Sequence, residues 1–335
     1  MTARSSYDNA LGTWRAWHDD AIPLRLGVSS CLLGEEVRYD GGHCRNRFVV
    51  DILGQWFEWV PVCPEMEIGM GTPRPTIRLL ADGDTVKLVA PKTGEDFTKR
   101  MRAYSRKRVG ELTRSGLDGY ILKKGSPSCG IERLPVFGEN GVLRRNGVGV
   151  YTDTLKRAWP NLPIEDEGRL NDAGLRENFI ERTFCRNRWR SLRHRGLTRR
   201  GLVAFHTAHK FLLQAHNEAG FRRLGKLVAS AGTIRDQVLF AEYEEGLHTV
   251  MTTRATKKKH VNVLQHSLGF LKRVLDPGEK REILTTIEDF GAGLLPLVVP
   301  LALLRFNIRK HNIDYLQGQL YFDPHPKELM LRNHV

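Results

Sequence analysis

The 335-residue sequence has few cysteines, and none of them is paired at the short spacing that zinc sites use. Its five cysteines are widely separated, and no C-x₂₋₄-C pair occurs. An odd number of distant cysteines in a chain of this length is not typical of a disulfide scaffold. We therefore expect these residues to be thiols, metal ligands or catalytic groups.

Long apolar runs are also absent. The nearest approach to a membrane span, "GLLPLVVPLALL" at 293–304, contains two prolines and falls short of the roughly 20 apolar residues that a spanning helix needs. The first residues, "MTARSSYDNALGTW", lack the apolar core of a signal peptide. The sequence predicts a cytoplasmic protein without a membrane partner, and it indicates no particular oligomeric state.

Acidic residues are scarce in the second part of the chain. Residues 1–185 carry 27 Lys/Arg and 25 Asp/Glu, a net charge of +2, whereas residues 186–335 carry 25 and 13, a net charge of +12. Ten of the twelve histidines lie in this second part as well. Hydrophobic content of 41% and charged content of 27% are typical of a soluble chain with a sizeable core, and the length favours two domains.

The first part alternates short apolar runs with amphipathic ones. Strands are predicted at 22–30, 57–62 and 117–124, with a hairpin at 76–90 around Asp82-Gly83-Asp84. Helices are predicted at 96–116, ended by Gly116, and within 147–164, where Pro160 closes the helix before a short strand. This alternation predicts an α/β fold with a mostly parallel, Rossmann-like sheet.

The second part has no comparable strands. Six stretches carry apolar residues at three- and four-residue spacing, at 201–216, 221–232, 234–255, 260–275, 277–293 and 295–311. We therefore predict an all-helical C-terminal domain. The arginine-dense segment "FCRNRWRSLRHRGLTRR" precedes it, so the domains are expected to be 1–185 and 186–335.

Three cysteines each follow a predicted buried strand. Cys31 closes "LRLGVSSC", Cys63 closes "WVPVC" and Cys129 follows "GYILKKGSPSC". Loops after the carboxyl ends of parallel strands converge on one crevice, so the three thiols are expected to meet. Three thiolates suit zinc or an iron–sulfur cluster with one open iron. Buried cysteines that pack as small hydrophobes remain an equally weighted alternative.

The segments around these cysteines resemble a known family. "VSSCLLGEEVRYDGGH", "VPVCPEMEIGMGTPRPTIRL" and "ILKKGSPSCG" are similar to the signature segments of the DUF523 family, which includes the thiouracil desulfidases. "LVAFHTAHKFLLQAH", "RATKKKHVNVLQHSLGF", "PLVVPLALLRFNIRKH" and "YFDPHPKELMLRNHV" resemble the DUF1722 domain. Chains that join the two domains resemble bacterial RNA desulfidases that convert 4-thiouridine in tRNA to uridine.

The resemblance implies a [4Fe-4S] cluster held by Cys31, Cys63 and Cys129, with the fourth iron binding the thiocarbonyl sulfur. Cys44 and Cys185 match no ligand position of the family pattern. Family members often carry a further cysteine where this chain has Val37, so a ligand at that position is not expected here.

Replacing sulfur by oxygen needs a water molecule that has been activated for attack, and a carboxylate near the cluster could activate it. Glu65, in "CPE", is the candidate general base, with an N-cap or salt-bridge role as the alternative. The family pattern places a functional serine at Ser126, which could instead only cap its turn. The other candidate substrate contacts in the first part are Asp40, Arg38, Arg74 and Lys124, while Ser29 and Ser30 could donate to cluster sulfurs and His43 is left open.

The charge of the second part is typical of a nucleic-acid binder, and tRNA is the expected partner. One candidate cluster runs from Arg186 to Arg200, and the second comprises Arg254, Lys257, Lys258 and Lys259. The histidines at helical spacing (His206, His209, His216, His260 and His266) are expected to be core residues rather than metal ligands. Two alternatives stay open, namely a desulfidase of free thiolated bases or nucleotides and a non-catalytic, zinc-stabilised nucleic-acid adaptor.

Overall fold

The computed structural model describes residues 13–138 and 141–333 and divides them into two compact units. One unit, the α/β unit, is Leu24–Asn171, and the other, the helical unit, combines the residues before Leu24 with those from Asp172 onward. The division expected at 185/186 falls inside helix α5 (Ala173–His194), whose first turn is capped by Asp172. The arginine-dense segment is the second half of that helix together with the turn to the next helix, which begins at Arg199, and it is not a linker between domains.

A parallel sheet forms the centre of the α/β unit, as the alternation of strands and helices predicted. It contains β1 (Arg25–Ser29), β2 (Glu58–Val62), β5 (Gly119–Leu122) and β8 (Ile164–Asp166) in the order β2-β1-β5-β8. All four residues of β5 are buried, because the strand is covered on both faces. Because β2, β1 and β5 are parallel neighbours, the loops that follow them leave the same edge of the sheet.

A second sheet has the order β4-β3-β6-β7 and mixes strand directions. The predicted hairpin is β3 (Arg78–Asp82) and β4 (Thr85–Val89), turning at Gly83 with φ +57°. Its other strands, β6 (Leu134–Gly138) and β7 (Gly141–Gly147), were not expected. Most of β7 is exposed, and its sequence, "GVLRRNG", lacks the alternation of apolar residues that marks a half-buried strand.

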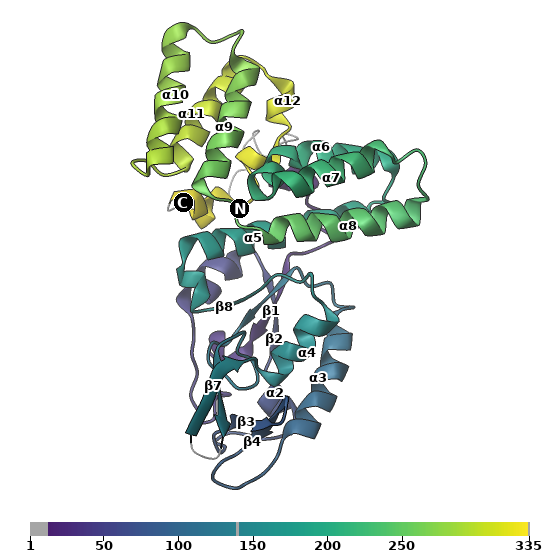
Figure 1. Cartoon of the computed structure of the whole chain (residues 1–335), viewed down its shortest axis with the longest axis vertical. Helices are drawn as coiled ribbons and strands as arrows, with labels where there is room; N and C mark the ends of the chain where they lie inside the picture. The colour runs from purple at the N-terminus through teal and green to yellow at the C-terminus, as the bar shows by residue number, and fades with distance from the viewer. Residues whose placement is uncertain (1–12, 139–140, 334–335) are drawn as a thin grey trace. The chain divides into compact units, whose positions relative to one another are not determined.

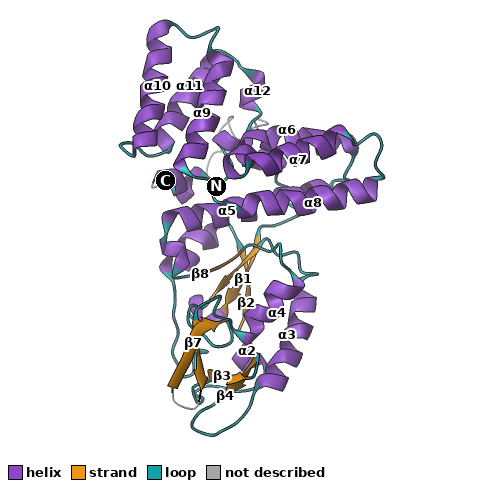
Figure 2. Ribbon diagram, viewed as in Figure 1, coloured by secondary structure: helices purple, strands orange, loops and turns teal. Residues whose placement is uncertain are grey.

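Helices α3 (Thr98–Leu112) and α4 (Val150–Ala158) lie side by side in the α/β unit (Figure 1). The short α2 (Pro64–Glu67) follows β2 directly. Helix α3 ends before Gly116, which forms a left-handed turn (φ +73°). The predicted strands and helices of this unit fall where the sequence placed them, and Figure 2 shows them together with the second sheet.

The helical unit contains all six helices that the periodicity predicted between residues 201 and 311, and also α5, which was not predicted. Its longer helices are α5, α6 (Arg199–His216), α7 (Glu218–Ala229), α8 (Asp236–Thr252), α9 (Lys257–Leu271), α10 (Pro277–Ala292) and α11 (Val298–Lys310), with short α1 (Trp14–Trp17) and α12 (Asp314–Gln317). Helices α6, α7 and α8 pack together, and so do α9, α10 and α11 (Figure 1). Trp189, Phe205 and Tyr243 lie in the shared core. Among the described residues, no helix combines the length and the apolar character needed to cross a membrane.

Candidate active site

Cys31, Cys63 and Cys129 line one cavity of about 240 Å³ in the α/β unit. Cys31 lies in the turn after β1, Cys63 directly follows β2, and Cys129 lies in the loop after β5. Because β2, β1 and β5 are parallel neighbours, their carboxyl ends bring the three loops together. The structure thus places the three predicted ligands where the sequence argument expected them.

The three thiols influence one another electrostatically. Burial, together with the neighbouring thiols Cys44 and Cys63, raises the pKa of Cys31 to about 12. Burial and then Glu65 raise the pKa of Cys63 to about 11. Burial also raises the pKa of Cys129, against a hydrogen bond from Ser29 that lowers it. Such thiols need a nearby cation to become thiolates, and a metal ion supplies that charge.

The donor set fits an iron–sulfur cluster that is bound through three cysteines. Within residues 13–138 and 141–333, no group of three His, Cys, Asp or Glu side chains is arranged to hold a metal ion. This result is compatible with a four-iron cluster, because each of its cysteine ligands binds a different iron. The ligands of such a cluster surround a volume instead of meeting at one point.

Glu65 and Ser126 face each other beside Cys63. Glu65 is buried (8% exposed), its Oε2 lies 3.7 Å from the Cys63 Sγ, and the Ser126 hydroxyl donates to its Oε1 (3.4 Å). The Ser126 Oγ also accepts the backbone N–H groups of Ser128 and Cys129 (3.2 and 3.1 Å). Ser126 therefore caps the cysteine turn and contacts the candidate base at the same time.

Ser29 and Glu167 position the segment between β5 and the cysteine turn. The backbone N–H of Lys123 donates to the Ser29 Oγ (2.9 Å), and the backbone N–H of Lys124 donates to Glu167 (2.7 Å). The Lys123 ammonium is ion-paired with Glu167, and both Lys123 and Lys124 line the cavity. Glu167 was not a sequence candidate, and only its position just after β8 could have suggested it.

Arg38 and Arg74 line the cavity, whereas Asp40 is not among its described lining residues. Arg38 donates to the Cys44 Sγ (2.7 Å) and forms an ion pair with Asp40 (3.3 Å), so Asp40 orients this arginine. Arg74 Nη1 donates to the Gly71 carbonyl (2.8 Å). Tyr39, which sequence analysis missed, lines the cavity while 44% exposed. His43 accepts the Arg45 N–H within its own loop.

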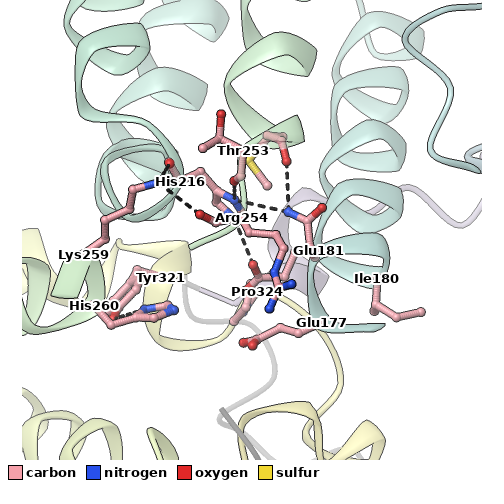
Figure 3. Close-up of polar contacts among 12 residues, drawn as sticks. Glu177, Ile180, Glu181, His216, Thr253, Arg254, Lys259, His260, Tyr321 and Pro324 are labelled. Carbon is pink, nitrogen blue, oxygen red and sulfur yellow. Dashed lines mark hydrogen bonds and ion pairs between the residues drawn. The ribbon is translucent and has the colours of Figure 1, made fainter. Parts of the chain in front are cut away.

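The lysine cluster of the helical unit lies at the start of α9. Lys257 and Lys258 are exposed in its first turn. The Lys259 ammonium is occupied by the carbonyls of His216 (2.6 Å) and Arg254 (3.0 Å), as Figure 3 shows. Arg254 is exposed, with Asp172 at 3.9 Å. Lys257, Lys258 and Arg254 are therefore accessible, whereas Lys259 has a structural role.

The arginine cluster between Arg186 and Arg200 is not a continuous surface. Arg186 and Arg188 are buried, and Arg188 donates to His209 and to the Pro324 carbonyl (3.0 and 2.7 Å). Arg193 is ion-paired with Glu244, and Arg199 with Asp236. The expectation of one basic patch here is wrong, because most of these guanidinium groups are used in packing and in ion pairs.

Four of the five histidines are buried or half-buried in the core, as expected, whereas His266 is exposed and that part of the expectation is wrong. His209 and His216 are buried, and His216 contacts the buried Glu181 (2.9 Å). His206 contacts Tyr243 (3.1 Å), and His260 contacts Tyr321 (2.9 Å). Burial lowers the pKa of His260 to about 3. Burial also lowers the pKa of His206 and His209, so these three imidazoles are neutral hydrogen-bonding groups.

Comparisons with known proteins divide the chain in the same way. The profile of the 2-thiouracil desulfurase family matches residues 26–167, and that of DUF1722, described as a protein of unknown function, matches residues 210–326. The uncharacterized protein YbgA of Escherichia coli (strain K12) is 27% identical over 165 residues, covering 49% of this chain and 98% of that protein.

The uncharacterized protein YbbK of Bacillus subtilis (strain 168) is 32% identical over 154 residues, covering 43% of this chain and 97% of that protein. A solved structure, the [4Fe-4S]-dependent thiouracil desulfidase TudS, is 30% identical and covers 44% of this chain and 94% of its own, with a TM-score of 0.37. The resemblance carried by the cysteine segments is confirmed, and the chain belongs to the 2-thiouracil desulfurase family, here joined to a DUF1722 domain.

Proposed function

We propose that this thiouracil desulfurase-family protein converts 4-thiouridine in tRNA to uridine with the aid of a [4Fe-4S] cluster. The observation that carries the proposal is the convergence of Cys31, Cys63 and Cys129 with Glu65 and Ser126 on one cavity. Water supplies the oxygen, the carbon–sulfur bond breaks, and hydrosulfide and a proton leave. No electrons are gained or lost, so no external reductant or oxidant is required.

Cys31, Cys63 and Cys129 would hold the cluster, and a bound cluster would supply a Lewis-acidic iron for the thiocarbonyl sulfur. Cluster binding would hold Cys63 as a thiolate, without an S–H to donate to Glu65. The Glu65 Oε2, 3.7 Å from the Cys63 Sγ, would then be available to accept a hydrogen bond from water. Glu65 is therefore assigned as the general base for the attacking water.

Ser126 fixes the orientation of that base. Its hydroxyl donates to Glu65 Oε1 while its oxygen holds the Cys129 backbone N–H. Lys124 and Arg74 line the same cavity, where a cation stabilises the negative charge that develops on the pyrimidine during attack. Arg38, held by Asp40, provides a further cation for a base or phosphate.

The helical unit is assigned to tRNA binding. The excess of 25 Lys/Arg over 13 Asp/Glu after residue 185 favours a polyanionic partner. Lys257 and Lys258 lie in the first turn of α9, where the helix dipole already favours anions. Reaching a thiolated base in folded tRNA requires its extrusion, which costs a few kcal/mol that phosphate contacts can offset.

The test is anaerobic reconstitution of the full chain with iron and sulfide, followed by incubation with tRNA that bears 4-thiouridine. Loss of the thiobase absorbance and release of hydrosulfide are expected. Glu65→Gln should keep iron loading and lower turnover by about 10²- to 10⁴-fold. Cys31→Ala should lower loading itself, and Glu58→Gln, an exposed carboxylate outside the described cavity lining, is the matched carboxylate control. A fully loaded protein that leaves the thiobase intact contradicts the proposal.

Free 2-thiouracil is the second candidate substrate, because the matching family is described by that compound. Supplying 2-thiouracil and thiolated tRNA to the same loaded protein separates the two. Turnover of the free base that exceeds turnover of tRNA, together with no salt-sensitive tRNA binding, would favour this candidate. Zinc in place of iron after anaerobic purification would instead favour a non-catalytic adaptor.

A further inference from the structure

An exposed aromatic cluster occurs in the helical unit. Phe270 of α9 and Tyr315 of α12 stack with their ring centroids 5.1 Å apart and their planes at 22°. Phe211 of α6 packs edge-on against both rings, at 6.1 and 6.3 Å. His266, one turn before Phe270, packs edge-on against Phe211 at 5.4 Å. Rings from three helices thus fix one parallel pair.

The stacked pair is accessible although its support is buried. Phe270 is 39% exposed and Tyr315 36% exposed, whereas Phe211 is fully buried. Hydrophobic burial therefore does not account for the outer surfaces of the pair. Because Phe211 holds both rings edge-on, their orientation is fixed before any partner binds, and less entropy is lost on binding.

Cations accompany this aromatic pair. The Lys210 ammonium lies 5.5 Å from the ring centroids of both Phe211 and Tyr315. Arg273 is exposed one turn after Phe270. The nearby acids are Asp314, adjacent to Tyr315, and Glu218, which acts on His266 but is already ion-paired with Arg222 (2.7 Å). The arrangement of a flat apolar surface beside cations favours a ligand that is both aromatic and anionic.

We propose that Phe270 and Tyr315 form a stacking platform for an unpaired nucleobase of RNA, with Lys210 contacting an adjacent phosphate. The inference rests on the tRNA partner of the proposed function and adds which feature of the RNA is recognised. An extended stack accepts any base, because every base has a π face. Single-stranded or loop nucleotides, whose bases are free to stack on side chains, are the class that this surface binds.

The test measures binding of the full-length protein to a short single-stranded RNA that carries one 2-aminopurine, whose fluorescence falls when it stacks. Phe270→Ala and Tyr315→Ala should each weaken binding by roughly 5- to 100-fold and reduce the quenching. Phe270→Trp should retain both. Phe306→Ala is the matched control, because Phe306 is 56% exposed on α11 and lies outside the stacked pair.

The salt dependence separates stacking from charge. Phe270→Ala should leave the slope of log Kd against log salt unchanged, whereas Lys210→Ala should reduce it by about one ion. If the wild type binds the RNA and the Phe270→Ala and Tyr315→Ala variants bind it with the same affinity and quenching, the platform is refuted while the tRNA partner is not. Absence of RNA binding by the wild type would refute the partner and the platform together. A change of oligomeric state in Phe270→Ala, with RNA affinity unchanged, would show that this face binds protein instead.

Discussion

The substitution Arg332→Met tests a buried ion cluster that ties the last described residues to α5. Arg332 Nη2 donates to Glu181 Oε1 (2.9 Å), and its Nε lies 3.4 Å from Glu177. Glu181 also contacts His216 (2.9 Å), and Figure 3 shows these acids beside His216. Methionine approximately preserves the volume but leaves two buried carboxyl groups without their guanidinium.

Removing one partner of a buried ion cluster costs about 3 to 5 kcal/mol, because a charge stays buried without compensation. Burial and the neighbouring Glu181 raise the pKa of Glu177, so Glu177 carries little charge at pH 7 and Glu181 is the main uncompensated charge, which favours the lower end. We therefore expect a loss of about 3 kcal/mol in the free energy of unfolding. For a unit of this size, the corresponding decrease in Tm is roughly 6 °C or more.

Urea unfolding of the full chain at pH 7, followed by far-UV circular dichroism, measures this loss. Arg305→Met is the matched control, because Arg305 Nη1 donates one long bond (3.4 Å) to the Phe322 carbonyl, and it should cost less than about 1 kcal/mol. Adding Glu181→Gln to Arg332→Met should cost less than the sum of the single substitutions. A loss below 1 kcal/mol for Arg332→Met would show that the cluster does not hold this segment.

Three further predictions concern pH, the cysteine turn and RNA binding. Because the pKa of Glu177 is raised in the folded state, its contribution to stability is present below the ordinary value of 4.5 and is lost as the pH rises above it. Glu177→Gln should therefore reduce the decrease of the urea midpoint with rising pH, and a pH profile equal to that of the wild type would contradict this prediction. Gly149→Ala places a Cβ 2.3 Å from the Ser128 carbonyl oxygen, so it should destabilise the α/β unit by about 1 to 3 kcal/mol and lower iron loading. Gly110→Ala, in open space on α3, should do neither, and equal unfolding midpoints of the two variants would refute the clash. The double substitution Lys257→Ala and Lys258→Ala should reduce the slope of log Kd against log salt for tRNA binding by about one ion per lost phosphate contact. Lys280→Ala, on another exposed helix face, should leave this slope unchanged, and an equal slope in all variants would place the RNA elsewhere.

The convergence of the three cysteines was predictable because it depends on topology. Cys31, Cys63 and Cys129 each follow a strand, and parallel neighbouring strands bring their following loops to one edge. The contact between Glu65 and Ser126 was not predictable in the same way. It depends on the exact path of the turn after β5, where Gly125 has φ +75°, and no periodic pattern encodes a side-chain distance of this kind.

Elements without an apolar pattern were the ones that sequence analysis missed. Strand β7 is mostly exposed, so its identity comes from pairing with β6 and not from its own residues. The second half of α5 carries arginines at buried positions, including Arg188, and a dense run of arginine is more typical of a solvated face. The structure satisfies Arg188 with His209 and the Pro324 carbonyl, which are distant in sequence.

The same comparison narrows where RNA binding is expected. Charge density indicated two basic clusters, but ion pairs and buried contacts use Arg188, Arg193 and Arg199 of the first one. Lys257 and Lys258 instead occupy the first turn of α9, where the helix dipole disfavours positive charge. A placement that weakens the isolated helix is compensated when phosphates bind there, since cations and free backbone N–H groups then act on the same anion. Under the proposed function, position relative to a helix terminus is therefore a better guide to an RNA-binding face of the helical unit than the count of charges.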